Sequence, residues 1–292
     1  MTNPPSELPV NSGPPVCYRH PDRVSYIRCT RCNQPICPEC MVAAPVGFQC
    51  PVCVGAAAAA QPVVRTYAGG SQVKKPIVTY VLIGINVAAF ALQMLVGVDA
   101  VAVDWGMWPI GIGIYNEWWR LLTGAFLHGS FLHIAFNMYV LFALGPTLER
   151  VLGHGRYLLL YMVSALGGSV ASYAFSDFHT VSVGASGAIF GLMGALVVAG
   201  RRLRYDIKQV AVLLVINFVI GFISPGVDWR AHLGGMLTGA AMAAVLIMAP
   251  RANRVLWQTL GVAGILLVLG AVVAWRTADL LALVAPIGGL AT

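Results

Sequence analysis

The sequence predicts an all-α polytopic membrane protein preceded by a small metal-binding module. Of its 292 residues, 58% are hydrophobic and only 10% are charged, whereas an ordinary soluble domain has about 25% charged residues. All seven cysteines lie before residue 54, outside the apolar part of the chain. The composition excludes a soluble globule, a disordered chain, collagen and a pure disulfide scaffold.

The amino-terminal module follows a polar, proline-rich stretch, 1–16, which we expect to be disordered. Residues 17–53 hold four pairs of metal-ligand residues, with two residues between the members of each pair. The pairs are Cys17 and His20, Cys29 and Cys32, Cys37 and Cys40, and Cys50 and Cys53. Eight ligands divide into two tetrahedral sites with none left over, so we expect two structural zinc ions. A disulfide framework would leave one thiol unpaired and would not explain the histidine.

The four pairs can be used sequentially or interleaved, and the spacing alone leaves both arrangements open. The pattern resembles a B-box-type zinc finger, a resemblance that implies interleaving. A segment this short cannot build its own core, so metal binding must supply its folding energy, on the order of 10 kcal/mol per zinc. Eight ligands for two ions leave no open coordination position, which favours a structural role. The partner of the finger is unknown.

Residues 54–75 are expected to be a linker, and the membrane region begins after it. Seven stretches contain no Asp, Glu, Lys or Arg, and each is long enough for a helix that crosses the membrane, which needs about 20 residues. In the second stretch we expect 121–130 to be a loop, with the helix starting near Phe131. A carboxyl-terminal region, 251–292, contains the last stretch. The stretches are 76–98, 121–148, 157–176, 178–200, 209–227, 231–250 and 255–275.

The basic residues predict the orientation of these helices. If the cysteines lie in the cytoplasm, where thiols stay reduced, most Lys and Arg residues flanking the helices also fall inside, as the positive-inside rule requires. We therefore expect a plasma-membrane protein with a cytoplasmic amino terminus and an extracytoplasmic carboxyl terminus. These flanking residues also account for the net charge of +7, so no nucleic-acid partner is expected.

Polar residues within the apolar stretches are costly, so each needs a reason. His133 and Asn137 are four residues apart and share one face of the second helix. Ser186 lies in a Gly-Ala-Ser-Gly motif that starts at Gly184, and His232 lies at the start of the sixth helix. The second, fourth and sixth helices run in the same direction, so these side chains share one depth near the outer surface.

Glycines predict which helices pack together. Gly187 and Gly191 in the fourth helix, and Gly235 and Gly239 in the sixth, have the small-x3-small spacing that lets helix backbones approach. His232 lies on the same face as the second pair. If these two helices are neighbours, the serine hydroxyl comes within hydrogen-bond reach of the imidazole. A serine activated by a histidine is a nucleophile suited to acyl-bond hydrolysis.

With these residues the chain resembles the rhomboid family of intramembrane serine proteases. The resemblance covers about 76–250, a six-helix core, and the seventh helix is an addition at the carboxyl end. The matching motifs are His133-x3-Asn137, Gly184-x-Ser186-Gly187, Ala231-His232-x2-Gly235-x3-Gly239, Trp119-Arg120 and Glu149-Arg150.

This resemblance implies a role for each residue. Ser186 is the nucleophile, and His232 is the general base and then the general acid, without a third triad member. The oxyanion is held by Asn137, His133 and the backbone at Gly184 and Ser186. The substrates are single-pass membrane proteins, and catalysis needs no cofactor.

Some neighbouring residues depart from that pattern or invite other interpretations. The family often has a tyrosine four residues after the nucleophile, where this chain has Phe190, whose ring can still stack on the histidine. His128 is expected to have no chemical role. Asp228 is a weak candidate for orienting His232. The Glu149-Arg150 pair is expected to be a structural ion pair.

The sequence leaves three alternative functions. The main alternative is a catalytically silent rhomboid-like protein that binds membrane clients, although all the catalytic residues are present. A transporter or channel would place ionisable groups near the middle of the membrane, and the apolar stretches contain no Asp, Glu, Lys or Arg. A finger with a simple membrane anchor would not need seven helices.

Overall fold

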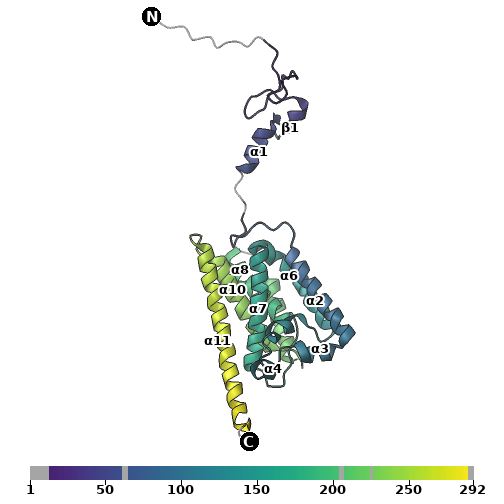
Figure 1. Cartoon of the computed structure of the whole chain (residues 1–292), viewed down its shortest axis with the longest axis vertical. Helices are drawn as coiled ribbons and strands as arrows, with labels where there is room; N and C mark the ends of the chain where they lie inside the picture. The colour runs from purple at the N-terminus through teal and green to yellow at the C-terminus, as the bar shows by residue number, and fades with distance from the viewer. Residues whose placement is uncertain (1–12, 61–64, 204–206, 224–225, 289–292) are drawn as a thin grey trace. The chain divides into compact units, whose positions relative to one another are not determined.

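The chain forms two compact units, Met1–Val63 and Val64–Thr292, in a computed structural model (Figure 1). The structure describes residues 13–60, 65–203, 207–223 and 226–288. The first unit is the cysteine-rich module, and the second is the helical membrane unit. The mainly helical architecture confirms the predicted fold class.

The cysteine-rich module contains little regular structure. Its elements are the 3-10 helix η1 (Pro38–Cys40), the antiparallel strands β1 (Val42–Ala43) and β2 (Phe48–Gln49), and helix α1 (Pro51–Ala59). The Cys50 side chain caps α1 by accepting a hydrogen bond from the Cys53 N–H, so this helix starts within the ligand pattern and runs into the expected linker. The buried side chains are mainly cysteines, with Ile36 among them.

The membrane unit contains a helix in each of the seven apolar stretches. Five helices, α2, α6, α7, α10 and α11, are long and apolar enough to cross a membrane, whereas α9 and the apolar part of α8 are shorter. The bounds are α2 (Ile77–Val96), α3 (Val98–Trp105), α4 (Pro109–Gly113), α5 (Arg120–Thr123), η2 (Gly124–Phe126), α6 (Phe131–Leu152), α7 (His154–Phe175), α8 (Ser186–Leu203), α9 (Lys208–Ile223), α10 (Trp229–Met248) and α11 (Arg254–Gly288).

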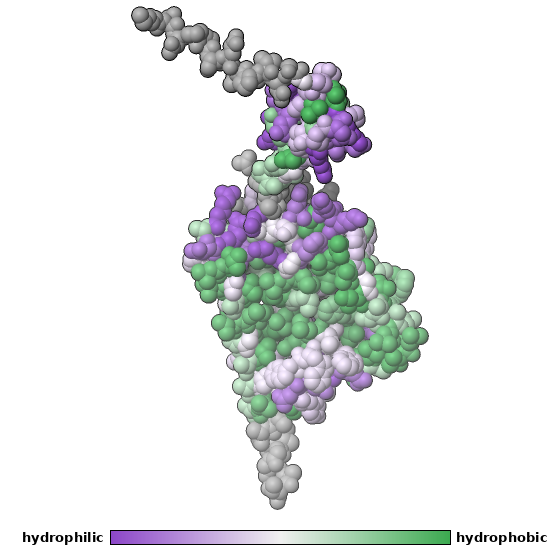
Figure 2. Space-filling view, turned by 45° about the horizontal axis from the view of Figure 1, so that its top comes forward, coloured by the Kyte–Doolittle hydropathy of each residue, from purple (hydrophilic) through white to green (hydrophobic). Residues whose placement is uncertain are grey.

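The surface of this unit carries a broad belt of hydrophobic side chains, shown in green in Figure 2. The apolar helices expose large side chains such as Leu95, Leu132 and Leu267, which are 86%, 80% and 74% exposed. An apolar surface of this extent is not stable in water and is suited to the hydrocarbon interior of a bilayer. The chain is therefore an integral membrane protein.

The segment between α3 and α5 is held by the arginine of the Trp-Arg motif. Arg120 is only 4% exposed. Its guanidinium donates to the carbonyl oxygens of Val103 and Gly106 at 2.7 and 3.1 Å and pairs with the Glu117 carboxylate at 2.5 Å. A buried charge needs such partners, so this residue ties the loop together rather than facing the lipid.

The buried Glu149 side chain has other partners than the sequence predicts. It does not form the expected ion pair with Arg150 in the described part of the chain, because adjacent residues on a helix point in different directions. Its buried carboxylate accepts from the backbone N–H groups of Val78 and Thr79, both at 2.9 Å, and from the ring of His154 at 2.5 Å. It therefore caps the amino end of α2, whose first N–H groups have no partner within the helix.

Helices α8 and α10 pack through their glycines, as the spacing predicts. A Cβ atom on Gly235 would lie 2.0 Å from the carbonyl oxygen of Gly187, and one on Gly239 would lie 2.1 Å from that of Gly191. These distances are shorter than any real contact, so only glycine allows the two backbones to touch. This contact brings the amino ends of the two helices together.

Gly239→Ala is expected to destabilise the membrane unit. The added methyl group meets backbone rather than a flexible side chain, so α8 and α10 must move apart, at a cost of about 1–3 kcal/mol. The melting temperature in detergent should fall. Gly264→Ala in α11 is the matched control, because the described residues outside its own helix backbone place no atom within 4 Å of its Cβ position. Equal melting temperatures for the two variants would contradict the backbone contact.

Candidate active site and metal-ligand clusters

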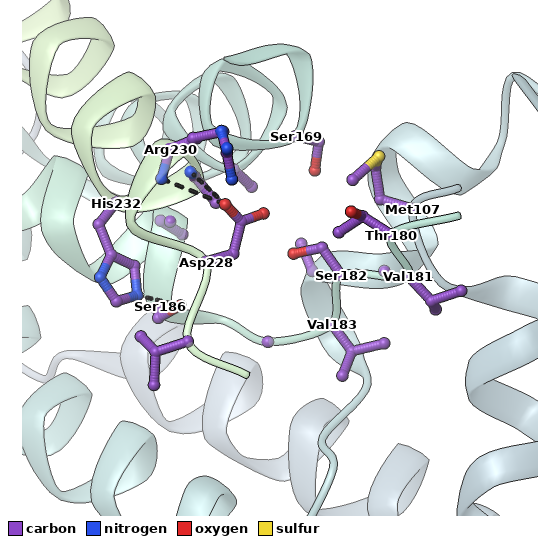
Figure 3. Close-up of a pocket in the computed structure, with 18 of the residues that line it drawn as sticks. Met107, Ser169, Thr180, Val181, Ser182, Val183, Ser186, Asp228, Arg230 and His232 are labelled. Carbon is purple, nitrogen blue, oxygen red and sulfur yellow. Dashed lines mark hydrogen bonds between the residues drawn. The ribbon is translucent and has the colours of Figure 1, made fainter. Parts of the chain in front are cut away.

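Ser186 and His232 meet at the amino ends of α8 and α10. The Ser186 Oγ lies 3.0 Å from the His232 Nε2, a hydrogen-bond distance, and His232 is 6% exposed. Figure 3 shows the two side chains at one wall of a cavity. The serine starts its helix directly after a turn at Gly184, which has a φ of 137°. Residues 177–185 therefore form a loop, and α8 starts later than the predicted stretch from 178.

Phe190 fixes the plane of the imidazole. The two rings stack with a centroid distance of 4.1 Å and an interplanar angle of 10°. Phe190 lies one helical turn after Ser186, so α8 supplies both the serine and the surface against which His232 rests. A stacked ring keeps Nε2 directed at the serine without needing the hydroxyl of a tyrosine.

His133 and Asn137 line a cavity of about 300 Å³ together with Ser186 and His232. Asn137 is 4% exposed, and its amide nitrogen has no hydrogen-bond partner among the described residues. A buried donor without a partner is costly, so this amide is available to an acceptor that enters the cavity.

The His133 ring presents a second donor. Its Nδ1 accepts a hydrogen bond from the Gly129 N–H at 3.4 Å, so a neutral ring carries its proton on Nε2. A Cβ on Gly184 would lie 2.8 Å from this ring, so glycine keeps the space beside Ser186 open. The Ser186 N–H lies at the first position of α8, where helix N–H groups lack intrahelical partners and the helix dipole favours negative charge.

A second cavity, of about 330 Å³, is also lined by Ser186 and His232. Ser169 and Thr180 contribute polar groups to its lining, and Figure 3 shows them facing the same hollow. A polar cavity of this size can hold several water molecules. Ser186 and His232 therefore line both a mainly apolar cavity and this second one, called the polar cavity below, whose lining mixes polar and apolar groups.

Asp228 lines the polar cavity but does not orient the imidazole. Its Oδ1 caps α10 by accepting from the N–H groups of Arg230 and Ala231 at 3.1 and 3.3 Å, and its Oδ2 accepts from the Ser172 hydroxyl. Figure 3 shows the carboxylate pointing away from His232. The His232 Nδ1 has no hydrogen-bond partner in the described ranges, so the site is a pair rather than a triad.

His128, which was expected to have no chemical role, lies beside the site. It is fully buried, and its ring lies 5.1 Å from that of His133 in an edge-to-face arrangement. Gln93 holds its backbone through hydrogen bonds of 2.9 and 3.2 Å. Burial lowers the pKa of His128, so the ring stays neutral and supports His133 by packing. His128 lies in a loop five residues before His133, where side chains follow no helical repeat. The sequence pattern therefore does not connect it with the site.

In the cysteine-rich module the ligand pairs are interleaved. Two groups of four side chains have ligand atoms within 4.8 Å of one another, and they join the first pair with the third and the second with the fourth. The structure therefore selects the cross-braced arrangement. The groups are Cys17, His20, Cys37 and Cys40, and Cys29, Cys32, Cys50 and Cys53.

The geometry and charge of both groups fit a bound cation. Zn–S bonds of about 2.3 Å in a tetrahedron place sulfur atoms about 3.8 Å apart, and the Cys32 and Cys50 Sγ atoms are 3.8 Å apart. Burial and the neighbouring thiols raise the pKa of Cys40 to about 11. The Cys50 thiol and burial raise the pKa of Cys53 to about 12. Each group thus keeps a thiol proton until a cation offsets the repulsion between thiolates.

Comparisons with known proteins agree with the geometry of the helical unit. Residues 115–249 match the family described as Rhomboid domain. The chain is 37% identical over 190 residues to the rhomboid protease GluP of Bacillus subtilis, an alignment that covers 62% of this chain. It is 39% identical over 159 residues to the mitochondrial RHOMBOID-like protein 6 of Arabidopsis thaliana, covering 52% of this chain.

The alignments cover different shares of the relatives' own lengths. The aligned part of the chain spans 37% of GluP and 50% of RHOMBOID-like protein 6. YdcA of Bacillus subtilis is 39% identical over 134 residues, which cover 44% of this chain and 67% of YdcA. The range that matches the family, 115–249, includes the helices that carry Ser186 and His232.

Proposed function

The chain belongs to the rhomboid family, and from this premise we propose that it is an intramembrane serine endopeptidase that cleaves single-pass membrane proteins. The observation that carries the proposal is the 3.0 Å separation of the Ser186 Oγ and the His232 Nε2. Two cavities meet at this pair, one mainly apolar and one with both polar and apolar walls. The site can thus receive a peptide from one side and water from the other.

The reaction follows from the positions of the groups. His232 Nε2 takes the proton of Ser186 Oγ as the oxygen bonds to the substrate carbonyl carbon. The resulting oxyanion accepts hydrogen bonds from the Ser186 N–H, the His133 Nε2–H and the Asn137 amide. The imidazolium then gives its proton to the leaving amine, and the C–N bond breaks. Water, deprotonated by His232, then attacks the acyl carbon; the bond from that carbon to Ser186 Oγ breaks, and the imidazolium returns the proton to the serine oxygen.

The substrate class follows from membrane physics. Peptide bonds in a membrane-spanning helix are shielded because the helix satisfies its own backbone groups in lipid. A segment with small or helix-destabilising residues can unwind and present a carbonyl to Ser186. We therefore propose that the cleavage site lies in or beside the transmembrane segment of the substrate.

The proposal includes the metal, the domains and the location. The two cysteine-rich groups are assigned structural zinc. The proposed boundaries are a finger at 17–53, a linker at 54–75, a protease core at 76–250 and a seventh helix with its tail at 251–292. The proposed location is the plasma membrane, with a cytoplasmic amino terminus and an extracytoplasmic carboxyl terminus. The basic residues that flank the helices support this orientation.

Cleavage of a fluorescent single-pass substrate by the purified chain in detergent tests this function. We expect two products, with the cut mapped by mass spectrometry to the transmembrane segment or its border. A second substrate whose small residues in that segment are replaced by leucine should be cut more slowly, because its helix unwinds less readily. A substrate that binds the chain and stays intact would instead support the silent client-binding alternative.

A further inference from the structure

A basic pocket lies at the end of α10 opposite to His232. Its volume is about 1000 Å³, and it is formed by the hairpin 65–71, the start of α7 and the connection from α10 to α11. Hydrophilic residues border the apolar belt along this edge in Figure 2. Four arginines line the pocket: Arg65, Arg156, Arg251 and Arg254. None of them takes part in the proposed reaction.

The positive charges of this pocket are not neutralised. No described carboxylate forms an ion pair with any of the four arginines. Their hydrogen bonds go to neutral oxygens, such as the Gln258 side chain for Arg156 at 2.9 Å and the Tyr67 carbonyl for Arg254 at 3.4 Å. Guanidinium groups crowded around one hollow repel each other, so an anion bound there would stabilise the arrangement.

The pocket is held open by specific contacts. Gln258 is 6% exposed, and its amide donates to the carbonyl oxygens of Ala68 and Leu246 at 3.1 and 2.7 Å. The Thr66 hydroxyl donates to the Leu152 carbonyl at 3.3 Å. These bonds fix the hairpin against α11 and α6 and join α11 to α10, so the arginines are positioned before any ligand arrives.

An apolar groove continues from the basic pocket. It has a volume of about 540 Å³, lies between α10 and α11, and shares Met248, Ala249 and Pro250 with the pocket. Trp257 and Leu260 form part of its wall. The basic pocket and the apolar groove therefore form one continuous site, with positive charge at one end and apolar walls at the other.

We propose that this site binds an anionic phospholipid. The arginines hold the phosphate, since guanidinium matches phosphate oxygens in charge and geometry, and one acyl chain lies in the groove between α10 and α11. Basic pockets between helices at the membrane interface suit this class of ligand. A soluble anion or an acidic peptide would use only the arginines and leave the groove empty.

Native mass spectrometry of the full chain in detergent tests the site, with phosphatidylglycerol and phosphatidylcholine as matched lipids. The wild type should bind one phosphatidylglycerol with about tenfold preference over phosphatidylcholine. The double variant Arg65→Gln/Arg251→Gln should lose this preference. The double variant Lys74→Gln/Lys75→Gln removes the same amount of charge from exposed residues outside the pocket. This control should retain the preference for phosphatidylglycerol. Equal behaviour of the two double variants would overturn the proposal.

The groove is tested separately. Leu260→Gln places a polar amide in its wall and should weaken phosphatidylglycerol binding about tenfold. Leu267→Gln changes another exposed leucine of α11 that does not line the groove and should have no such effect. Binding of glycerol phosphate as strong as that of the lipid, or insensitivity to Leu260→Gln, would show a simple anion site and overturn the lipid assignment.

Discussion

Replacement of Ser186 by alanine is expected to abolish cleavage of a transmembrane substrate while the fold stays intact. The change removes the proposed nucleophile, the Ser186 Oγ, which lies 3.0 Å from the His232 Nε2. Loss of a catalytic serine or histidine lowers kcat by about 10⁶ in subtilisin. We expect His232→Ala to cause a loss of the same order, because the hydroxyl then has no base.

The two residues should act as one unit. The double variant Ser186→Ala/His232→Ala should be no slower than either single variant, since each change already removes the nucleophilic mechanism. Initial rates of cleavage of the fluorescent substrate measure the loss in each variant. Melting temperatures equal to that of the wild type exclude unfolding as its cause. Ser182→Ala is the matched control, because this serine lines the polar cavity and has no assigned role. A wild-type rate from Ser186→Ala, or losses that simply add in the double variant, would contradict the mechanism.

The sequence predicts those parts of the site that depend on local helix geometry. His133 and Asn137 share a face because they are four residues apart, and both line the cavity beside Ser186. The glycine spacing on the fourth and sixth stretches predicts the backbone contact that brings His232 to the serine. In both cases a short repeat within one helix decides which side chains point the same way.

Contacts between distant segments could not be predicted in this way. Glu149 caps a helix 70 residues earlier in the chain, and no periodic pattern connects the two. The pocket of four arginines exists because the hairpin at 65–71 packs on the start of α11, which a linker composition does not reveal. The pairing of the cysteines likewise depends on how loops cross, so the spacing left two arrangements open.

Metal removal is expected to unfold the amino-terminal module and leave cleavage by the membrane unit intact. The buried side chains of the module are mainly the ligands themselves, so about 10 kcal/mol or more of folding energy is lost with each structural zinc. All seven cysteines lie in this module, so thiol labelling with a maleimide mass tag reports on it alone. Chelation should change the mass from that of an unlabelled chain to that of a chain carrying seven tags.

Cys32 makes this experiment specific for metal. Its side chain is exposed, so only coordination, and not burial, can protect it from the reagent. Loss of the cleavage rate on chelation would contradict the separation of the two units, and continued protection of Cys32 would contradict a metal at this position.

The interleaved pairing gives a further outcome for the same assay. Cys29→Ala removes one ligand from the second group, but the chain between Cys29 and Cys53 also carries Cys37 and Cys40 of the first group. Loosening of one site therefore frees the segment that forms the other, and all six remaining cysteines should react together. Thr30→Ala, at an exposed neighbouring position, should keep them protected. Labelling confined to the ligands of the second group would instead indicate two independent sites, as sequential pairing would produce.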